Sequence, residues 1–420
     1  IHMGTLGKRR GERVTHRERV LQALSFEETD RPPMDLGSTL CTGISCFAYP
    51  GLVGALNLPP RRPRVHDTAQ MLALPDLDVL DALGCDVVTV AQFYNRTNGF
   101  EQPDKWHPYD FNGRLDALVA RPERFELLED GTIVQPRFGT KMPPGAYVFD
   151  AEHGGQPVSL SADIPKPDLA ELRKRLENGL LTPNRIETCT DMCRRVREST
   201  DRAVMLHGPT AGISIMGFGG VGIFPMLCLT DRDFVAELHE LVIGYSIEQL
   251  ERLLPAIHRY IDVYFCCADD WGSQQHTLAS PQTYEDLFLP YYRRYNDAIH
   301  EIAPQLKTFL HTCGAVYDLI DPIIESGFDI LNPVQWTAGG HGFREWKDKC
   351  RNRISLWGGG VNSQGALVHG SVEDVEAEVR EIVDYLQTDG GFVFNGIHNL
   401  LAEVSPEKIQ AMYRTAAVSA

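Results

Sequence analysis

The sequence lacks any apolar run that approaches the roughly 18 residues needed for a membrane-spanning helix, and it has no hydrophobic segment typical of a signal peptide. It is also poor in positive charge, since 40 lysines and arginines stand against 57 aspartates and glutamates, for a formal net charge of −17. Such an acidic protein is a poor partner for nucleic acid or for an anionic membrane. We therefore expect a cytoplasmic protein that binds neither.

The cysteines lack the close spacing of a small disulfide-rich domain. There are 10 in 420 residues, which is typical of free thiols in a reducing compartment. The segment Ile1–Gly4 reads as an expression remnant, so residues 1–14 are interpreted as a tail and residues 15–420 as one domain.

Short apolar runs alternate with helical patterns along this domain. Eight runs are expected to form strands, at residues 32–36, 86–90, 203–206, 262–266, 307–310, 328–331, 354–357 and 392–395. The helical patterns lie at residues 15–24, 67–83, 185–199, 231–253, 281–302, 316–325, 343–349 and 372–386. Eight such repeats predict an α/β protein with a (β/α)₈ TIM-type barrel. A doubly wound sheet would need a glycine-rich fingerprint after its first strand, and Gly37-Ser38-Thr39 is not one.

One segment interrupts the alternation. Residues 100–161 are rich in glycine, proline and aromatic residues, and Asp130-Gly131 is a turn signal between short strand-like runs. We predict a hairpin insertion over the second βα position, which forms either a lid or an inert decoration.

His311 and Cys313 lie two residues apart, where an apolar run ends and a helical pattern begins. In a parallel barrel this junction is at the rim that carries the chemistry. One imidazole and one thiolate at one point are a ligand pair that Zn²⁺ prefers. The alternative is a capping residue beside a small buried thiol.

Six of the eight runs are followed by polar segments, which a barrel would bring to one mouth. These segments begin at residues 207, 269, 311, 332, 358 and 396. Asp269 and Asp270 are the candidate catalytic residues among them, because a carboxylate at the rim can bind a metal or orient one of its ligands. Adjacent aspartates can equally be a helix N-cap and a solvated carboxylate.

Four stretches resemble the uroporphyrinogen decarboxylase superfamily, and the similarity extends over the chain from about Thr15. They are residues 17–33, 311–314, 328–335 and 357–364. The superfamily contains metal-free decarboxylases and zinc methyltransferases that use corrinoids. The decarboxylases carry an arginine-rich loop that grips porphyrinogen carboxylates, whereas residues 34–42 contain no arginine. The resemblance therefore favours the methyltransferase branch.

The resemblance to that branch implies zinc bound by His311, Cys313 and His398, with His398 at a position where the family has cysteine. The alternative for His398 is a histidine that forms hydrogen bonds at the rim. A neutral imidazole in place of a thiolate adds one positive charge to the site, which slightly favours an oxygen ligand. The fourth ligand position is left for substrate, water or a nearby aspartate.

The same resemblance implies that Gln335, Gly359 and Asn362 contact the cofactor. It further implies methyl transfer between a small ether, alcohol or thiol and a corrinoid, which a partner protein carries, and it implies a homodimer. Two alternatives stay open: a metal-free decarboxylase of a non-porphyrin substrate that uses Asp35, Asp269 or Asp270, and a barrel that binds its ligand without turnover.

Overall fold

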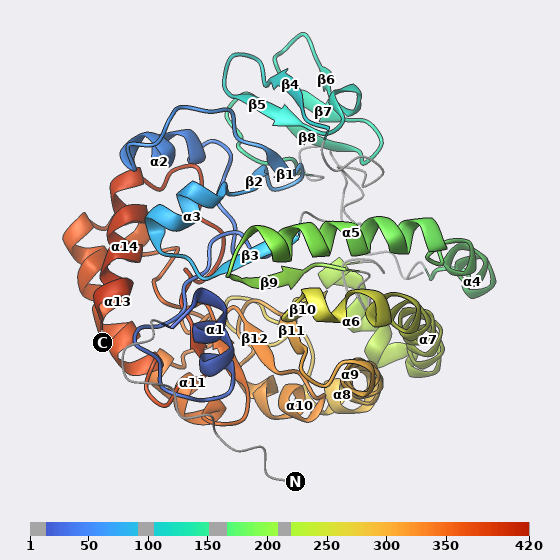
Figure 1. Cartoon of the computed structure of the whole chain (residues 1–420). Coiled ribbons are helices and arrows are strands. Elements are labelled where there is room, and N and C mark those ends of the chain that lie inside the picture. The colour runs from blue at the N-terminus through green and yellow to red at the C-terminus, as the bar shows by residue number, and fades with distance from the viewer. Residues whose placement is uncertain (1–13, 91–104, 151–165, 209–219, 420) are drawn as a thin grey trace.

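The computed structural model describes residues 14–90, 105–150, 166–208 and 220–419 (Figure 1). Its central sheet consists of β3 (Val87–Val90), β9 (Ala203–Leu206), β10 (Val263–Ala268), β11 (Lys307–His311), β12 (Ile330–Asn332), β13 (Ser355–Trp357) and β14 (Phe392–Val393). The order across the sheet is β14-β13-β12-β11-β10-β9-β3, and every neighbouring pair is parallel. Chain order is therefore sheet order, as a barrel requires.

The segment from Pro33 to Asp35 joins the two edges of this sheet. On one side the Met34 carbonyl accepts a hydrogen bond from the Asp86 amide at 2.7 Å, just before β3. On the other side the Asp35 amide donates to the Phe394 carbonyl at 2.9 Å, and the Phe394 amide donates to the Pro33 carbonyl at 2.7 Å. Residues 32–36, predicted as a strand, form only an isolated bridge from Met34 to Phe394, but they take the eighth position of the sheet. The predicted TIM-type barrel is confirmed.

Helices surround the strands, and α14 from the end of the chain packs against α2 and α3 from its beginning, with α13 on its other side (Figure 1). They are α1 (His16–Leu24), α2 (Tyr49–Ala55), α3 (Leu77–Leu83), α4 (Leu169–Asn178), α5 (Pro183–Ser199), α6 (Gly220–Thr230), α7 (Arg232–Ile257), α8 (Pro281–Leu287), α9 (Leu289–Ile302), α10 (Ile320–Glu325), α11 (Phe343–Cys350), α12 (Ala366–His369), α13 (Val372–Leu386) and α14 (Pro406–Val418). Helix α13 shows the common pattern: Ser371 and Asp374 form a capping box, and Val375, Val379 and Ile382 repeat at helical spacing on its buried face. Among the described helices, none is both long enough and apolar enough to span a bilayer.

Short antiparallel strands form the rest of the sheet structure. They are β1 (Val65–Asp67), β2 (Leu72–Ala73), β4 (His107–Asp110), β5 (Asp116–Val119), β6 (Glu126–Leu127), β7 (Ile133–Gln135) and β8 (Thr140–Met142). Strand β1 pairs with β2, β4 with β5, and β7 with both β6 and β8. Strands β4 to β8 stand together beside β1 and β2, outside the barrel (Figure 1). Both ends of the predicted insertion, residues 100–161, lie outside the described residues, so these bounds stay a prediction.

Two predicted helices differ from the structure. The helix expected over residues 67–83 is present only in its last part, as α3, because β1 and β2 occupy the beginning. There the Asp67 carboxylate accepts hydrogen bonds from two following backbone amides, which competes with helix formation, and Pro75 disfavours helix in the residues before it. The helix expected over residues 281–302 is divided at Phe288 into α8 and α9.

Side chains fill the inside of the barrel. Those that pack together there, from alternate positions of the strands, are Val87, Ala203, Met205, Val263, Phe265, Phe309, Ile330, Trp357 and Val393. The interior is therefore a packed core and not a channel, so a ligand site has to lie at the mouth.

A buried carboxylate holds the base of the barrel. Asp86 accepts hydrogen bonds from His16 and Arg19 of α1 at 2.7 Å each, from Arg31 at 2.6 Å and from the Met34 amide at 2.8 Å. Burial alone would raise the pKa of Asp86, but the hydrogen bonds from His16 and Arg31 and the charges of Arg31 and Arg19 lower it below its usual value. The ionised carboxylate therefore ties α1 and the closing segment to β3.

We expect Asp86→Ala to lower the free energy of unfolding by about 3–5 kcal/mol, because it leaves the largely buried Arg31 guanidinium without its carboxylate partner and Arg19 with Asp30 alone. Urea unfolding followed by circular dichroism measures this. The matched control is Asp116→Ala, which removes the exposed ion pair with Arg62 and should change stability by less than about 1 kcal/mol. Equal effects of the two substitutions would contradict a structural role for the Asp86 cluster.

Candidate metal centre

His311 is the last residue of β11, and its hydrogen bonds determine which ring nitrogen is available. The Asn332 side-chain amide donates to the Trp357 carbonyl at 2.8 Å, so the Asn332 Oδ1 atom faces the His311 Nδ1 atom at 2.6 Å. His311 therefore donates from Nδ1, and the lone pair of Nε2 is directed toward the mouth. A metal-binding histidine is oriented in this way by an acceptor on its other nitrogen.

The first group of donors combines His311 with Asp270 and Cys313, from the loops after β10 and β11. One ligand atom from each lies within 4.8 Å of the other two. The Asp270 Oδ1 atom is 3.5 Å from the His311 Nε2 atom and accepts a hydrogen bond from the Cys313 amide at 3.0 Å. The structure thus brings together three residues that the sequence predicted.

Two glycines set the distance between these loops. A Cβ atom built on Gly272 would lie 2.3 Å from the Ala315 amide nitrogen, and one on Gly314 would lie 2.3 Å from the Gly272 carbonyl carbon. The backbones are therefore in direct contact, closer than any larger residue permits, and Asp270 lies against Cys313 as a result.

The second group of donors combines His311 with Cys41 and His398, whose ligand atoms also lie within 4.8 Å of one another. The rings of His311 and His398 are 5.5 Å apart between centroids and inclined at 69°. The structure thus divides the predicted ligands, with His311 next to Cys313 in one group and next to His398 in the other. Cys41 was not predicted, since no spacing relates it to the His311 motif.

Burial and charge shape the titration of these groups. Burial, and the nearby His311, lower the pKa of His398 to about 4, so its imidazole is neutral at pH 7, as a ligand must be. Burial raises the pKa of the Cys313 thiol, and the adjacent Asp270 carboxylate raises it further. Burial would also raise the pKa of Asp270, but the charge of His311 and the Cys313 amide lower it. A bound divalent cation would favour the thiolate of Cys313, because it offsets the negative charge of Asp270.

The other predicted catalytic residue, Asp269, belongs to neither group of donors. It is fully buried and accepts a hydrogen bond from the Tyr292 hydroxyl of α9. Neighbouring residues at the end of a strand point in opposite directions. Asp269 therefore contacts the helical layer, while Asp270 faces the mouth.

The three predicted cofactor residues make structural contacts at the rim. Gln335 accepts a hydrogen bond from the Gly314 amide at 2.7 Å, which supports the loop that carries Cys313. A Cβ atom on Gly359 would lie 2.6 Å from that of Val334, so only glycine fits there. The Asn362 side chain accepts from the Gln364 amide at 3.0 Å. These contacts shape the loops after β12 and β13.

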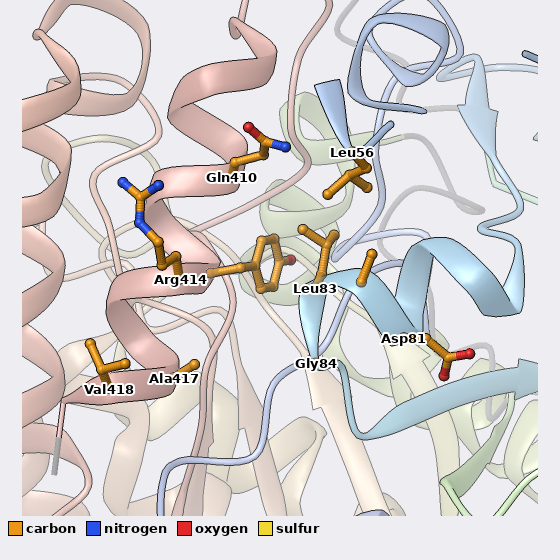
Figure 2. Close-up of a pocket in the computed structure, with 10 residues that line it drawn as sticks. Leu56, Asp81, Leu83, Gly84, Gln410, Arg414, Ala417 and Val418 are labelled. Atoms are coloured by element: carbon orange, nitrogen blue, oxygen red, sulfur yellow. The ribbon is translucent and has the colours of Figure 1, made fainter. Parts of the chain in front are cut away.

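A surface pocket of about 450 Å³ lies elsewhere, between α3 and α14 (Figure 2). It is lined by apolar residues such as Leu56 and Leu83, and its two charged residues are both paired, Arg414 with Glu376 and Asp81 with Arg202. The metal donors described above are not among the residues that line it. The donor groups and this pocket are therefore separate parts of the molecule.

Comparisons with known proteins agree on one family. The profile described as Uroporphyrinogen decarboxylase (URO-D) matches residues 148–418. The uroporphyrinogen decarboxylase of Syntrophotalea carbinolica is 30% identical over 144 residues, which cover 33% of this chain and 36% of that protein. The uroporphyrinogen decarboxylase of Synechocystis sp. is 23% identical over 174 residues, which cover 40% of this chain and 46% of that protein. The chain thus spans less than half the length of these curated relatives.

The fold is also similar to that of a solved protein. A methyltransferase from Methanosarcina mazei aligns over 96% of this chain and 98% of its own, with a TM-score of 0.56 and 14% sequence identity. At this identity the similarity shows a shared fold along almost the whole chain.

We expect Gly272→Ala to destabilise the protein by about 1–3 kcal/mol and to weaken metal binding, because the new methyl group forces the two loops apart. Urea unfolding and titration with zinc measure the two effects. Gly244→Ala is the control: this position lies inside α7, and a methyl group placed there would meet no atom of the described residues within 4 Å, so the change should be neutral or stabilising by up to about 1 kcal/mol. Unchanged zinc affinity in Gly272→Ala would show that loop contact does not position the donors.

Proposed function

Because this chain belongs to the uroporphyrinogen decarboxylase (URO-D) family, we propose that it is an enzyme whose active site is the donor cluster at the barrel mouth. We propose in particular a zinc-dependent methyltransferase that moves a methyl group between a small methylated ether, alcohol or thiol and a corrinoid. The observation that carries this proposal is the His311 Nε2 lone pair, which faces thiol, imidazole and carboxylate donors within 4.8 Å.

The residues of the site fit a zinc ion. Imidazole and thiolate are the ligands that zinc prefers, and carboxylate is a third. His311 and His398 offer imidazole nitrogens, and Cys313 offers sulfur. When bound, zinc supplies a Lewis acid that activates a sulfur or oxygen atom of the substrate.

Asp270 has a specific part in this proposal. Its carboxylate is held by the Cys313 amide at 3.0 Å and lies beside the thiol. Cys313 has to lose its proton to bind a cation, and the Asp270 carboxylate beside it opposes that loss until the charge of the cation offsets its own. The same carboxylate can afterwards occupy or orient the position next to His311.

A metal-free decarboxylase is the second candidate, because the curated relatives carry that name. Asp35 would be one of its acids. However, the Asp35 carboxylate is fully buried and accepts hydrogen bonds from the Ser38 hydroxyl at 2.6 Å and the Trp357 indole at 2.9 Å. Such a carboxylate stabilises the loop of residues 35–42 and is poorly accessible to a substrate.

We expect protein purified without added metal to contain about one zinc per chain, measured by elemental analysis. Cys313→Ser should lower zinc affinity by more than about 100-fold. Changing a residue that only hydrogen-bonds to a ligand already costs up to about 100-fold, and loss of the ligand itself should cost more. It should abolish methyl transfer from methylcobalamin, followed by the change in corrin absorbance. Cys350→Ser, a buried thiol of α11, is the control and should change neither quantity. Wild-type protein without zinc or affinity for it would refute the methyltransferase and favour the decarboxylase.

We also propose a corrinoid-carrying protein as partner and a homodimer as the assembly, both on the family resemblance. Light scattering over a wide concentration range should give twice the mass of the 47.0 kDa chain. A monomeric mass at every concentration would contradict the homodimer and leave the metal site unaffected.

A further inference from the structure

We propose that Cys41 is a ligand of the metal that His311 and His398 bind. This inference rests on the proposed metal site and assigns it a thiolate from the opposite end of the chain. Its first basis is distance, because one ligand atom each of Cys41, His311 and His398 lies within 4.8 Å of the others. Its second is location, since all three are at the mouth and Cys41 is only 7% exposed.

The loop of Cys41 is attached to the segment of His398 on both sides. Asn399 accepts a hydrogen bond from the Gly43 amide at 2.6 Å and donates to the Leu40 carbonyl at 2.9 Å. The next residue, Leu400, forms a parallel bridge with Ile44. These bonds fix the backbone before and after Cys41 relative to His398. The fold itself therefore places Cys41 close to His398.

The loop is also rigid within itself. The Cys41 amide donates to the Thr39 hydroxyl at 3.0 Å, and the Thr39 amide donates to the Thr42 hydroxyl at 3.1 Å. The Gly37 amide closes the loop on the Thr42 carbonyl at 2.7 Å. A loop ordered in this way holds a ligand at low entropic cost, which a flexible loop cannot do.

Both donor groups serve one cation. They share His311, whose Nδ1 atom is committed to Asn332, so that only Nε2 is available. One lone pair binds one metal ion. We therefore infer that the two groups serve one cation in common. With His311 they offer five donors, one more than the four ligands that zinc takes in a closed site.

Asp270 is the donor most easily left out of that set. Its Oδ1 atom already accepts a hydrogen bond from the Cys313 amide at 3.0 Å. Cys41 and Cys313 would then supply two thiolates, and His311 and His398 two imidazole nitrogens. Two thiolates balance the charge of Zn²⁺, which suits a buried site better than an excess of either sign.

Cobalt substitution tests this inference, because Co²⁺ takes the place of zinc and its thiolate charge-transfer absorbance grows with each sulfur ligand. The variants are Cys41→Ser and Cys41→Ala, and circular dichroism verifies that they are folded. The matched control is Cys46→Ser, a buried thiol five residues further along the same loop that belongs to neither donor group. X-ray absorption at the zinc edge counts sulfur neighbours at about 2.3 Å independently.

We expect both Cys41 variants to lose one sulfur neighbour and to bind zinc at least about 10-fold more weakly, while Cys46→Ser matches the wild type. A Cys41 variant with the wild-type spectrum and affinity overturns the inference and leaves the proposed function intact. A wild-type protein that binds metal through Cys41 but transfers no methyl group supports the inference and overturns the proposed methyltransferase function. Absence of metal binding by the wild type overturns both.

Discussion

A reciprocal pair of hydrogen bonds between Asp86 and Met34 holds the barrel closed. The Asp86 amide donates to the Met34 carbonyl, and the Met34 amide donates to the Asp86 carboxylate, at 2.7 and 2.8 Å. Everything that follows Met34 depends on this junction, including the loop that carries Cys41. The same carboxylate binds two arginines, so one ionised group at the base of the barrel determines the position of a donor at its mouth.

The mouth is organised by a second constraint, which starts from a backbone carbonyl. Trp357 orients the Asn332 amide, and Asn332 orients the His311 ring. The nitrogen that faces the other donors is therefore fixed before any ligand arrives. With Cys41 as a ligand, the site regains the negative charge that His398 does not supply. The expected preference for an oxygen ligand rested on the charge of a site made of His311, Cys313 and His398 alone. With a second thiolate in the site, that preference no longer follows.

The alternation of apolar runs and helical patterns was sufficient to predict the barrel, because each strand is short, buried and followed by a helix. The apolar spacing of residues 67–83 predicted a helix and missed β1 and β2, because it takes no account of the hydrogen bonds that the Asp67 carboxylate accepts from the Ala69 and Gln70 amides. The site follows the same rule. His311 and Cys313 were visible through their spacing, and Asp270 through its place after a strand. Cys41 was not, because barrel closure and Asn399 bring it to the site.

The contact between Gly272 and Gly314 has a consequence for the size of substrate that the mouth can accept. Two backbones that touch cannot be compressed further, and neither loop can retreat without losing the bond between Asp270 and the Cys313 amide. This side of the barrel mouth therefore cannot widen or narrow to fit a ligand. A bulkier ligand gains room only where side chains, and not main chains, form the boundary. In the proposed methyltransferase, a change of substrate should therefore act on those side chains and leave the two glycines unchanged.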